Sequence, residues 1–490
     1  MTTFLCPKCG LDRGQRQEVS SDNLSRDSHR LRLRTRLAEL DSLIAALSAE
    51  RQTLQAESDS IIYPVLSLPT EMTVEVFRRC VSPSSKPRPS PFHAPLILGQ
   101  ICRQWRQIAL HTPALWQALE FDGDLASVEI LKLWLSRTGN SPLSYYLHST
   151  TPSRAGALID ASILHSHQWQ DISFGLPMSS FLELDMRRRS FLLPILWTIS
   201  FEIHQRGDED AVETITIQNA PLLHEAHIST FPDIKFDIPS QNLTSLVLQH
   251  SVDVVECLAL LRKCPKLAHL VVLTTGSASI QHISPLTLDH MESLSFNLGH
   301  TSIMDYLTLP LLRRLTITTG AVKIQHPTSL LAFVHRSACD LEFLSFSVTD
   351  SRSDTLRLWL RAVPDSVAAV ELVAWRLSHD WFGDCLAILQ LPDVLPGLKT
   401  LRLRGSKLSN RAYDDLVSVL RARREVLPGR ALLDSCTLNL EMYAFAERYT
   451  PKLSTLTQFR ELAAAGMNIN LTITGTSNPL TRTILNLGAA

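Results

Sequence analysis

The sequence feature that most limits the fold is a short apolar pattern that occurs at least eight times between residues 223 and 403. Each copy has an apolar residue, two variable positions, a second apolar residue, one variable position and a third apolar residue. The six clear copies are Leu243, Leu246, Leu248; Leu267, Leu270, Val272; Met291, Leu294, Phe296; Leu312, Leu315, Ile317; Leu341, Leu344, Phe346; and Leu398, Leu401, Leu403. Weaker copies begin at Leu223 and Val367, and successive copies from Leu243 to Leu398 start 21 to 31 residues apart. A period in this range predicts one stacked structural unit per copy.

Helix-like stretches separate the copies of this pattern, and they span residues 254–265, 329–339, 355–364 and 411–424. A unit of one strand, one turn and one helix cannot bury its apolar face alone, so the units are predicted to stack. The predicted fold class is therefore α/β, with a curved solenoid over residues 120–475 that has parallel strands on one face and helices on the other. Residues 476–490 are predicted to be a tail.

One face of the predicted strands is exposed and concave, because alternate residues of a strand point to opposite sides of the sheet. Four residues on this face are candidates for binding a protein target: Arg314, Phe343, Arg402 and Arg404. Arginine forms bidentate, charge-assisted hydrogen bonds with carboxylates and phosphates, which favours an acidic or phosphorylated segment as the ligand. The alternative is that these are ordinary solvated arginines.

The N-terminal part of the chain contains a short heptad pattern. Apolar residues at heptad spacing predict a coiled-coil helix over residues 31–60, and they are Leu33, Leu37, Leu40, Ile44, Leu47 and Leu54. This helix either packs on its own protein or self-associates through residues 33–54. Residues 1–30 are predicted to be a flexible lead-in, because residues 10–30 are polar and lack apolar periodicity.

Residues 63–119 contain two amphipathic helix patterns in a short segment. Met72, Val76 and Phe77 line one face of a first helix that Pro69 can begin, because proline lacks an N–H at a position where none is needed. A second set recurs at steps of three and four residues and consists of Ile97, Ile101, Cys102, Trp105 and Ile108. The prolines between residues 82 and 95 predict a long connecting loop.

Three submotifs in order resemble the F-box: LPxE at Leu68 to Glu71, CRxWRxIA at Cys102 to Ala109, and TPxLW at Thr112 to Trp116. Together with the repeats behind it, the chain resembles F-box proteins with leucine-rich repeats, of the kind found in fungi. The resemblance implies that residues 63–119 form a small all-α domain that binds the Skp adaptor subunit of SCF-type cullin ubiquitin ligases. The residues implied in this contact are Leu66, Leu68, Pro69, Glu71, Met72, Val76, Phe77, Ile97, Ile101, Cys102, Trp105, Ile108, Leu115 and Trp116.

The resemblance implies a substrate-recognition adaptor in which other subunits perform the ubiquitin chemistry and no residue of this chain is catalytic. The alternative is an F-box scaffold or regulatory protein that acts without ubiquitylation of a target. The sequence contains no GxSxG, Walker, GxGxxG or HExxH motif that would indicate an enzyme. No cofactor is expected.

Cys6 and Cys9 form a CxxC pair, which is half of a tetrahedral zinc site. No second pair follows at a suitable spacing, so zinc within one chain is not expected, although two chains could each contribute one pair. The other cysteines, such as Cys257, Cys264 and Cys385, lie in apolar or helix-like stretches and are expected to be reduced, buried thiols.

The composition argues against several partners. The chain has 47 basic and 48 acidic residues, and this neutral balance provides no general attraction to nucleic acid or to a membrane surface. Arginines before the heptads do not make a basic zipper, because they overlap the first heptad. The N-terminus lacks the pattern of a secretory signal, and no apolar run is long enough to cross a membrane. We therefore expect a cytoplasmic or nuclear location.

Overall fold

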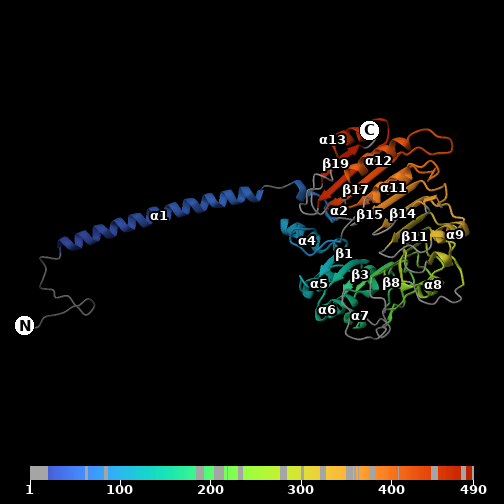
Figure 1. Cartoon of the computed structure of the whole chain (residues 1–490). Coiled ribbons are helices and arrows are strands. Elements are labelled where there is room, and N and C mark those ends of the chain that lie inside the picture. Colours follow the sequence, from blue (N-terminus) through green and yellow to red (C-terminus); the bar gives the residue numbers. More distant parts are fainter. Residues whose placement is uncertain are drawn as a thin grey trace, which may run out of the picture. The chain divides into compact units, whose positions relative to one another are not determined.

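The structure is a computed structural model of the 490-residue chain (Figure 1). It describes residues 20–60, 64–81, 86–183, 192–203, 214–217, 219–229, 235–275, 284–298, 303–319, 327–348, 357, 360–361, 363–374, 381–406, 408–442, 451–475 and 482–487. The chain divides into two compact units, residues 1–76 and 77–490.

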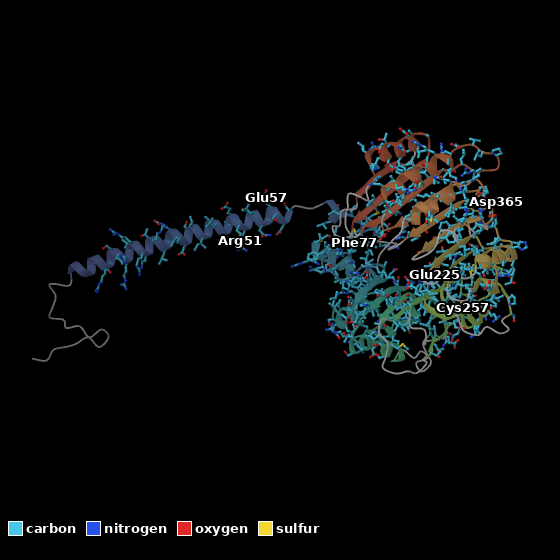
Figure 2. All side chains as sticks on the ribbon, in the orientation of Figure 1. Arg51, Glu57, Phe77, Glu225, Cys257 and Asp365 are labelled. Carbon is cyan, nitrogen blue, oxygen red and sulfur yellow. The ribbon has the colours of Figure 1, made fainter. Side chains whose placement is uncertain are left out.

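The first unit is dominated by one long helix, α1 (Ser20–Ser60). Residues 26–60 are all exposed, and Figure 2 shows their side chains, Arg51 and Glu57 among them, projecting around the helix. The coiled-coil segment is therefore helical as predicted, and its leucines are exposed in the single chain. Self-association through residues 33–54 stays a prediction. The predicted lead-in was wrong for residues 20–30, which lack proline and glycine and continue the helix.

Five short helical elements follow α1. They are η1 (Pro64–Ser67), α2 (Thr70–Cys80), α3 (Leu98–Ile101), α4 (Arg103–Leu110) and η2 (Pro113–Leu115). The two helices predicted from periodicity are present as α2 and α4, and the second is broken by the extended backbone of Cys102. The Cys102 Sγ accepts a hydrogen bond from the Trp105 N–H at 3.4 Å, and so caps α4.

A 15-stranded sheet forms the framework of the second unit. Its strands are β1 (Ala118–Asp122), β2 (Leu143–His148), β3 (Trp169–Leu176), β4 (Thr198–Ile203), β6 (Glu225–Ser229), β8 (Ser245–Asp253), β9 (His269–Thr275), β11 (Ser293–Leu298), β13 (Arg314–Thr319), β14 (Phe343–Val348), β15 (Ala369–Ala374), β16 (Thr400–Gly405), β17 (Ser435–Met442), β18 (Asn468–Gly475) and β19 (Arg482–Leu487). Neighbours in the sheet follow this order of the chain, and every pairing is parallel except that between β18 and β19. The α/β class with a large parallel sheet is confirmed.

Helices connect successive strands, and Figure 1 shows α5, α6, α8 and α9 outside the strands. The helices of this layer are α5 (Val128–Leu135), α6 (Pro152–Ile163), α7 (Met178–Glu183), α8 (Val254–Leu261), α9 (Pro327–Ser337), α11 (Trp381–Leu389), α12 (Asn410–Ala422) and α13 (Leu453–Ala464). Three predicted helical stretches, 254–265, 329–339 and 411–424, are confirmed as α8, α9 and α12. Most of the fourth, 355–364, lies outside the described residues.

Short elements complete the described structure. Two pairs of parallel strands stand apart from the large sheet, and they are β5 (Thr214–Thr216) with β7 (Lys235–Asp237), and β10 (Leu286–Thr287) with β12 (Leu307–Thr308). Two short 3₁₀ helices are η3 (Ser166–Gln168) and η4 (Ile303–Tyr306). Among the described residues, no helix is both long and apolar enough to span a lipid bilayer.

The apolar residues of the repeated pattern form the core between sheet and helices. In β16, Leu401 and Leu403 are buried, whereas Arg402 and Arg404 are exposed. This alternation follows from the two-residue period of a strand and keeps the same face buried in every unit. The predicted buried thiols Cys257, Cys264 and Cys385 are free and buried in this core, and Cys102 is half-buried.

Arginines at the ends of outer helices tie neighbouring units together. The guanidinium of Arg336, in the last turn of α9, donates two hydrogen bonds to Leu307 O, at 2.7 and 3.1 Å, and a further one to Met304 O. Arg423, which follows α12, donates to three carbonyls of the preceding unit. These guanidinium groups donate hydrogen bonds to carbonyls of a neighbouring unit that lie away from bulk solvent.

The two ends of the large sheet differ. At the first edge, the Glu120 N–H of β1 donates to Pro87 O at 2.9 Å, so the proline-rich segment lies along this strand. At the other edge, β19 returns antiparallel to β18, and the prediction of a tail over residues 476–490 was therefore wrong for residues 482–487. Leu485 and Leu487 on either side of Asn486 fit the two-residue period of a strand, and β19 becomes the last strand of the sheet.

Candidate functional site

The first candidate surface is the face of α2 that carries the apolar residues of the F-box-like motif. Met72 and Val76 lie one helical turn apart and are 56% and 44% exposed, and Leu68 before the helix is 39% exposed. Pro69 O accepts a hydrogen bond from the Thr73 N–H at 3.1 Å, which begins the helix at the predicted position. Exposed apolar side chains in a row on one helix are characteristic of a surface that binds a partner.

Two other predicted residues on this segment differ in exposure. Leu66 is half-buried in η1, and Glu71 is exposed in the first turn of α2. A carboxylate in the first turn is favoured by the helix dipole, which gives Glu71 a structural reason to be there besides any contact with a partner.

The second candidate surface lies on α3 and the residue before it. Ile97 and Ile101 are four residues apart and are 39% and 58% exposed. Trp105 and Ile108 of α4 are half-buried and pack against the core. Of these four predicted residues, Ile97 and Ile101 are therefore exposed enough to contact a partner, and Trp105 and Ile108 are only partly accessible.

The structure corrects the prediction for Phe77, Leu115 and Trp116, which are at most 1% exposed. The Phe77 ring packs edge-on against Trp105, with ring centroids 4.9 Å apart, and the Trp116 Nε1–H donates to Ala109 O at 2.8 Å. These aromatic residues fill the core of a small helical segment, which has few other large side chains. They support the exposed residues and do not contact a partner directly in this conformation.

The third candidate surface is the face of the large sheet opposite the helices, which we call the open face. Arg314 on β13 and Arg402 on β16 both place their guanidinium groups 5.9 Å from the centre of the Phe343 ring on β14. Arg404 pairs with Glu441 at 3.4 Å. The structure thus brings together three of the four residues predicted to bind a target.

Strand register explains this cluster. Phe343 lies opposite Arg314 on one side and Ala369 of β15 on the other. Because Ala369 has a small side chain, Arg402 reaches across β15 to the ring. Among the described residues, neither Arg314 nor Arg402 pairs with a carboxylate, and the ring holds each cation by a cation–π contact.

Acidic residues lie at the beginning of the open face. Lys86 pairs with Asp171 at 3.0 Å, and Arg88 pairs with Glu120. Both cations come from the proline-rich segment along β1. The first strands therefore have acidic groups that are already paired, whereas Arg314 on β13 and Arg402 on β16 form no ion pair with a described residue.

Three residues that the sequence analysis did not single out form a small cluster: Asp122, Asp124 and His148, whose ligand atoms lie within 4.8 Å of one another. Asp124 accepts hydrogen bonds from the Thr150 hydroxyl and N–H and from the Ser149 hydroxyl, at 2.5, 2.7 and 2.7 Å. The Thr150 hydroxyl is the main cause of the lowered pKa of Asp124.

These hydrogen bonds join the residue Asp124, which follows β1, to Ser149 and Thr150, which follow β2, and so give the cluster a structural role. No motif spacing could have indicated it, since His148 lies on a different strand. Cys6 and Cys9, the weak candidates for a metal, lie outside the described residues.

No protein-family model matches this chain, and no curated protein is similar to it.

Proposed function

We propose that this protein is a substrate-recognition adaptor of an SCF-type cullin–RING ubiquitin ligase. Residues 63–119 act as an F-box that binds the Skp adaptor subunit, and the strand-rich region behind it acts as a leucine-rich-repeat solenoid that binds a protein target. Its mechanism is proximity, because holding a target near a charged conjugating enzyme raises their effective concentration. The protein needs no catalytic residue for this role.

The observation that carries the proposal is the exposure of apolar side chains among the residues implied in the adaptor contact. Leu68, Met72, Val76, Ile97 and Ile101 all lie at least one-third exposed, although each could have been buried in a self-contained domain. Burial of such side chains by a partner stabilises a complex by about 1.5–3 kcal/mol for each one fully buried. The adaptor subunit is the partner that the motif implies.

The test is binding of the purified protein to a Skp–cullin complex. Met72→Glu/Val76→Glu places two charges in the proposed interface without disturbing a buried residue. Loss of two apolar contacts of about 1.5 kcal/mol or more each predicts binding at least about 100-fold weaker.

Arg78→Gln, an exposed change on the same helix, is the matched control and should bind as the wild type. Equal binding by the double variant, or no binding by the wild type, would refute the proposed F-box. Binding to the complex without ubiquitylation of any captured target in a reconstituted reaction would favour the scaffold role.

The target-binding part of the proposal rests on the cluster of Arg314, Phe343 and Arg402. Two cations without carboxylate partners among the described residues, held around an aromatic ring, favour an acidic or phosphorylated segment with an apolar neighbour. The next pair of residues on this face is Thr316 of β13 opposite Ser345 of β14, and both carry hydroxyl groups.

A display library of phosphorylated and unphosphorylated peptides tests this part. Peptides selected by the wild type should bind at least about tenfold more weakly to Arg314→Gln/Arg402→Gln, since each charged hydrogen bond contributes about 1.5–3 kcal/mol. Arg313→Gln is the control, because Arg313 is already paired with Glu342 at 3.2 Å. Unchanged binding by the double variant would exclude this cluster as the target site.

A further inference from the structure

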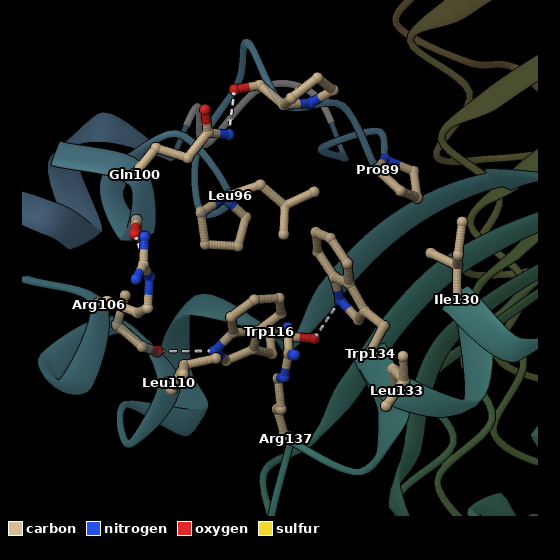
Figure 3. Close-up of a pocket in the computed structure, with 14 residues that line it drawn as sticks. Pro89, Leu96, Gln100, Arg106, Leu110, Trp116, Ile130, Leu133, Trp134 and Arg137 are labelled. Carbon is tan, nitrogen blue, oxygen red and sulfur yellow. Dashed lines mark hydrogen bonds between the residues drawn. The ribbon is translucent and has the colours of Figure 1, made fainter. Parts of the chain in front are cut away.

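A pocket of about 520 Å³ lies where the proline-rich segment, α4 and α5 meet, entirely within residues 77–490 (Figure 3). Its walls are mostly apolar and include Leu96, Leu110, Ile130 and Leu133. A volume of this size matches the sites in which proteins bind small organic molecules. The exposed residues proposed to contact the adaptor, Met72, Val76, Ile97 and Ile101, do not line this pocket.

Two tryptophans form a rigid aromatic wall of the pocket. Trp116 and Trp134 pack edge to face, with ring centroids 4.8 Å apart and an interplanar angle of 77°. Their indole N–H groups donate to Ala109 O at 2.8 Å and to Trp116 O at 2.9 Å. Both polar atoms are already bonded and both residues are at most 2% exposed, so the tryptophans close this side of the pocket and present little surface of their own to a ligand.

The cationic group of the pocket is the guanidinium of Arg137, which lies 4.5 Å from the centre of the Trp116 ring (Figure 3). It forms no hydrogen bond or ion pair with any residue that the structure describes, and burial lowers its pKa. Arg106, on the opposite side, uses its Nε–H to bond Gly99 O at 2.7 Å. A partly desolvated guanidinium without an anion is costly, and a ligand carboxylate would relieve that cost.

We propose that this pocket binds a small organic anion with an aromatic or alicyclic body and a single carboxylate. The body packs against the exposed parts of Leu110, Ile130 and Leu133, and the carboxylate accepts hydrogen bonds from Arg137. Most of the lining belongs to the segment proposed as the F-box, but the lining does not include Met72, Val76, Ile97 or Ile101, the exposed residues proposed to bind the adaptor. A ligand here would give the protein a ligand-responsive position beside its first repeat.

The test uses the full-length protein and three probes with the same ring system: 2-naphthoate, 2-naphthalenemethanol and 2-naphthylmethylammonium. Isothermal titration calorimetry should show one site that binds the naphthoate about tenfold or more tightly than the alcohol, since one charged hydrogen bond contributes about 1.5 kcal/mol or more. The ammonium probe should bind more weakly than the alcohol. In Arg137→Gln, the preference for the acid over the alcohol should disappear.

Two variants keep this test decisive. Arg103→Gln removes an exposed arginine of α4 that does not line the pocket, and it should leave the preference unchanged. Leu133→Gln, at a position 55% exposed, should weaken the acid and the alcohol equally without unfolding the protein. Equal affinity for acid and alcohol, a preference that survives Arg137→Gln, or no binding of any probe at 1 mM, as an order-of-magnitude limit, would overturn the proposal.

Discussion

Arg423 provides the sharpest test of how neighbouring units are held together. It is fully buried, and its guanidinium donates to Leu389 O at 2.9 Å, Leu395 O at 2.8 Å and Val394 O at 2.6 Å. The replacement Arg423→Met keeps the apolar stem and removes all three donors. Leu395 O also accepts from the Leu398 N–H at 3.2 Å, so this carbonyl keeps a partner.

The other two carbonyls would be left buried without their arginine donor. An unsatisfied buried polar group costs about 1–3 kcal/mol, so the free energy of unfolding should fall by about 4 kcal/mol, within a range of about 2–6 kcal/mol. The loss is not offset by the methionine, because its thioether donates no hydrogen bond. Arg423→Lys should fall between the wild type and the methionine variant.

Urea denaturation measures the loss, and hydrogen exchange of the amides in β16 and β17 shows whether it is local to these units. The control is Arg421→Met, two residues earlier, where the arginine is half exposed and pairs with Glu461 at 3.2 Å. A surface pair of this kind contributes at most about 1 kcal/mol. If Arg423→Met costs no more than Arg421→Met, the carbonyl bonds do not stabilise the stack, and the reasoning fails.

Two further predictions concern acid stability and thiol reactivity. Hydrogen bonds lower the pKa of Asp124 below its ordinary 3.8, so its contribution to stability is present above that pH and is lost as the pH falls further. In urea unfolding, the free energy of unfolding should therefore decline more steeply below about pH 4 for the wild type than for Asp124→Asn. Parallel curves for the two proteins would contradict this. Burial raises the pKa of Cys257 and Cys436 to about 12, whereas Cys80 is exposed. A thiol reagent should therefore modify Cys80 in the folded protein and modify the two buried thiols only after denaturation, which peptide mass mapping can measure.

The repeated apolar pattern was sufficient to predict parallel strands with one buried face. Leu401 and Leu403 are buried and Arg402 is exposed, because the period of a strand is two wherever it pairs. Strands without the full pattern were missed, among them β2 (LSYYLH) and β18 (NINLTITG). Their alternating residues are too short a signal to separate from loops without the neighbouring strands that complete their hydrogen bonds.

For the candidate sites, the sequence indicated which residues belong to the F-box-like segment, but not which side chains of that segment are exposed. Met72 and Phe77 occur in the same amphipathic pattern, yet one is exposed and the other lies against Trp105. A helical period defines an apolar face, and the arrangement of neighbouring elements determines which part of that face is covered.

By itself, the sequence determined the α/β class, the stacking of one unit after another and the helical nature of residues 31–60, since these depend on local periodicity. Only the tertiary structure decided that Arg402 reaches Phe343 across Ala369, that Arg137 meets Trp116, and that β19 pairs with β18. Each of these depends on the register or packing of elements far apart in the chain, and residue spacing along a sequence does not encode such distances.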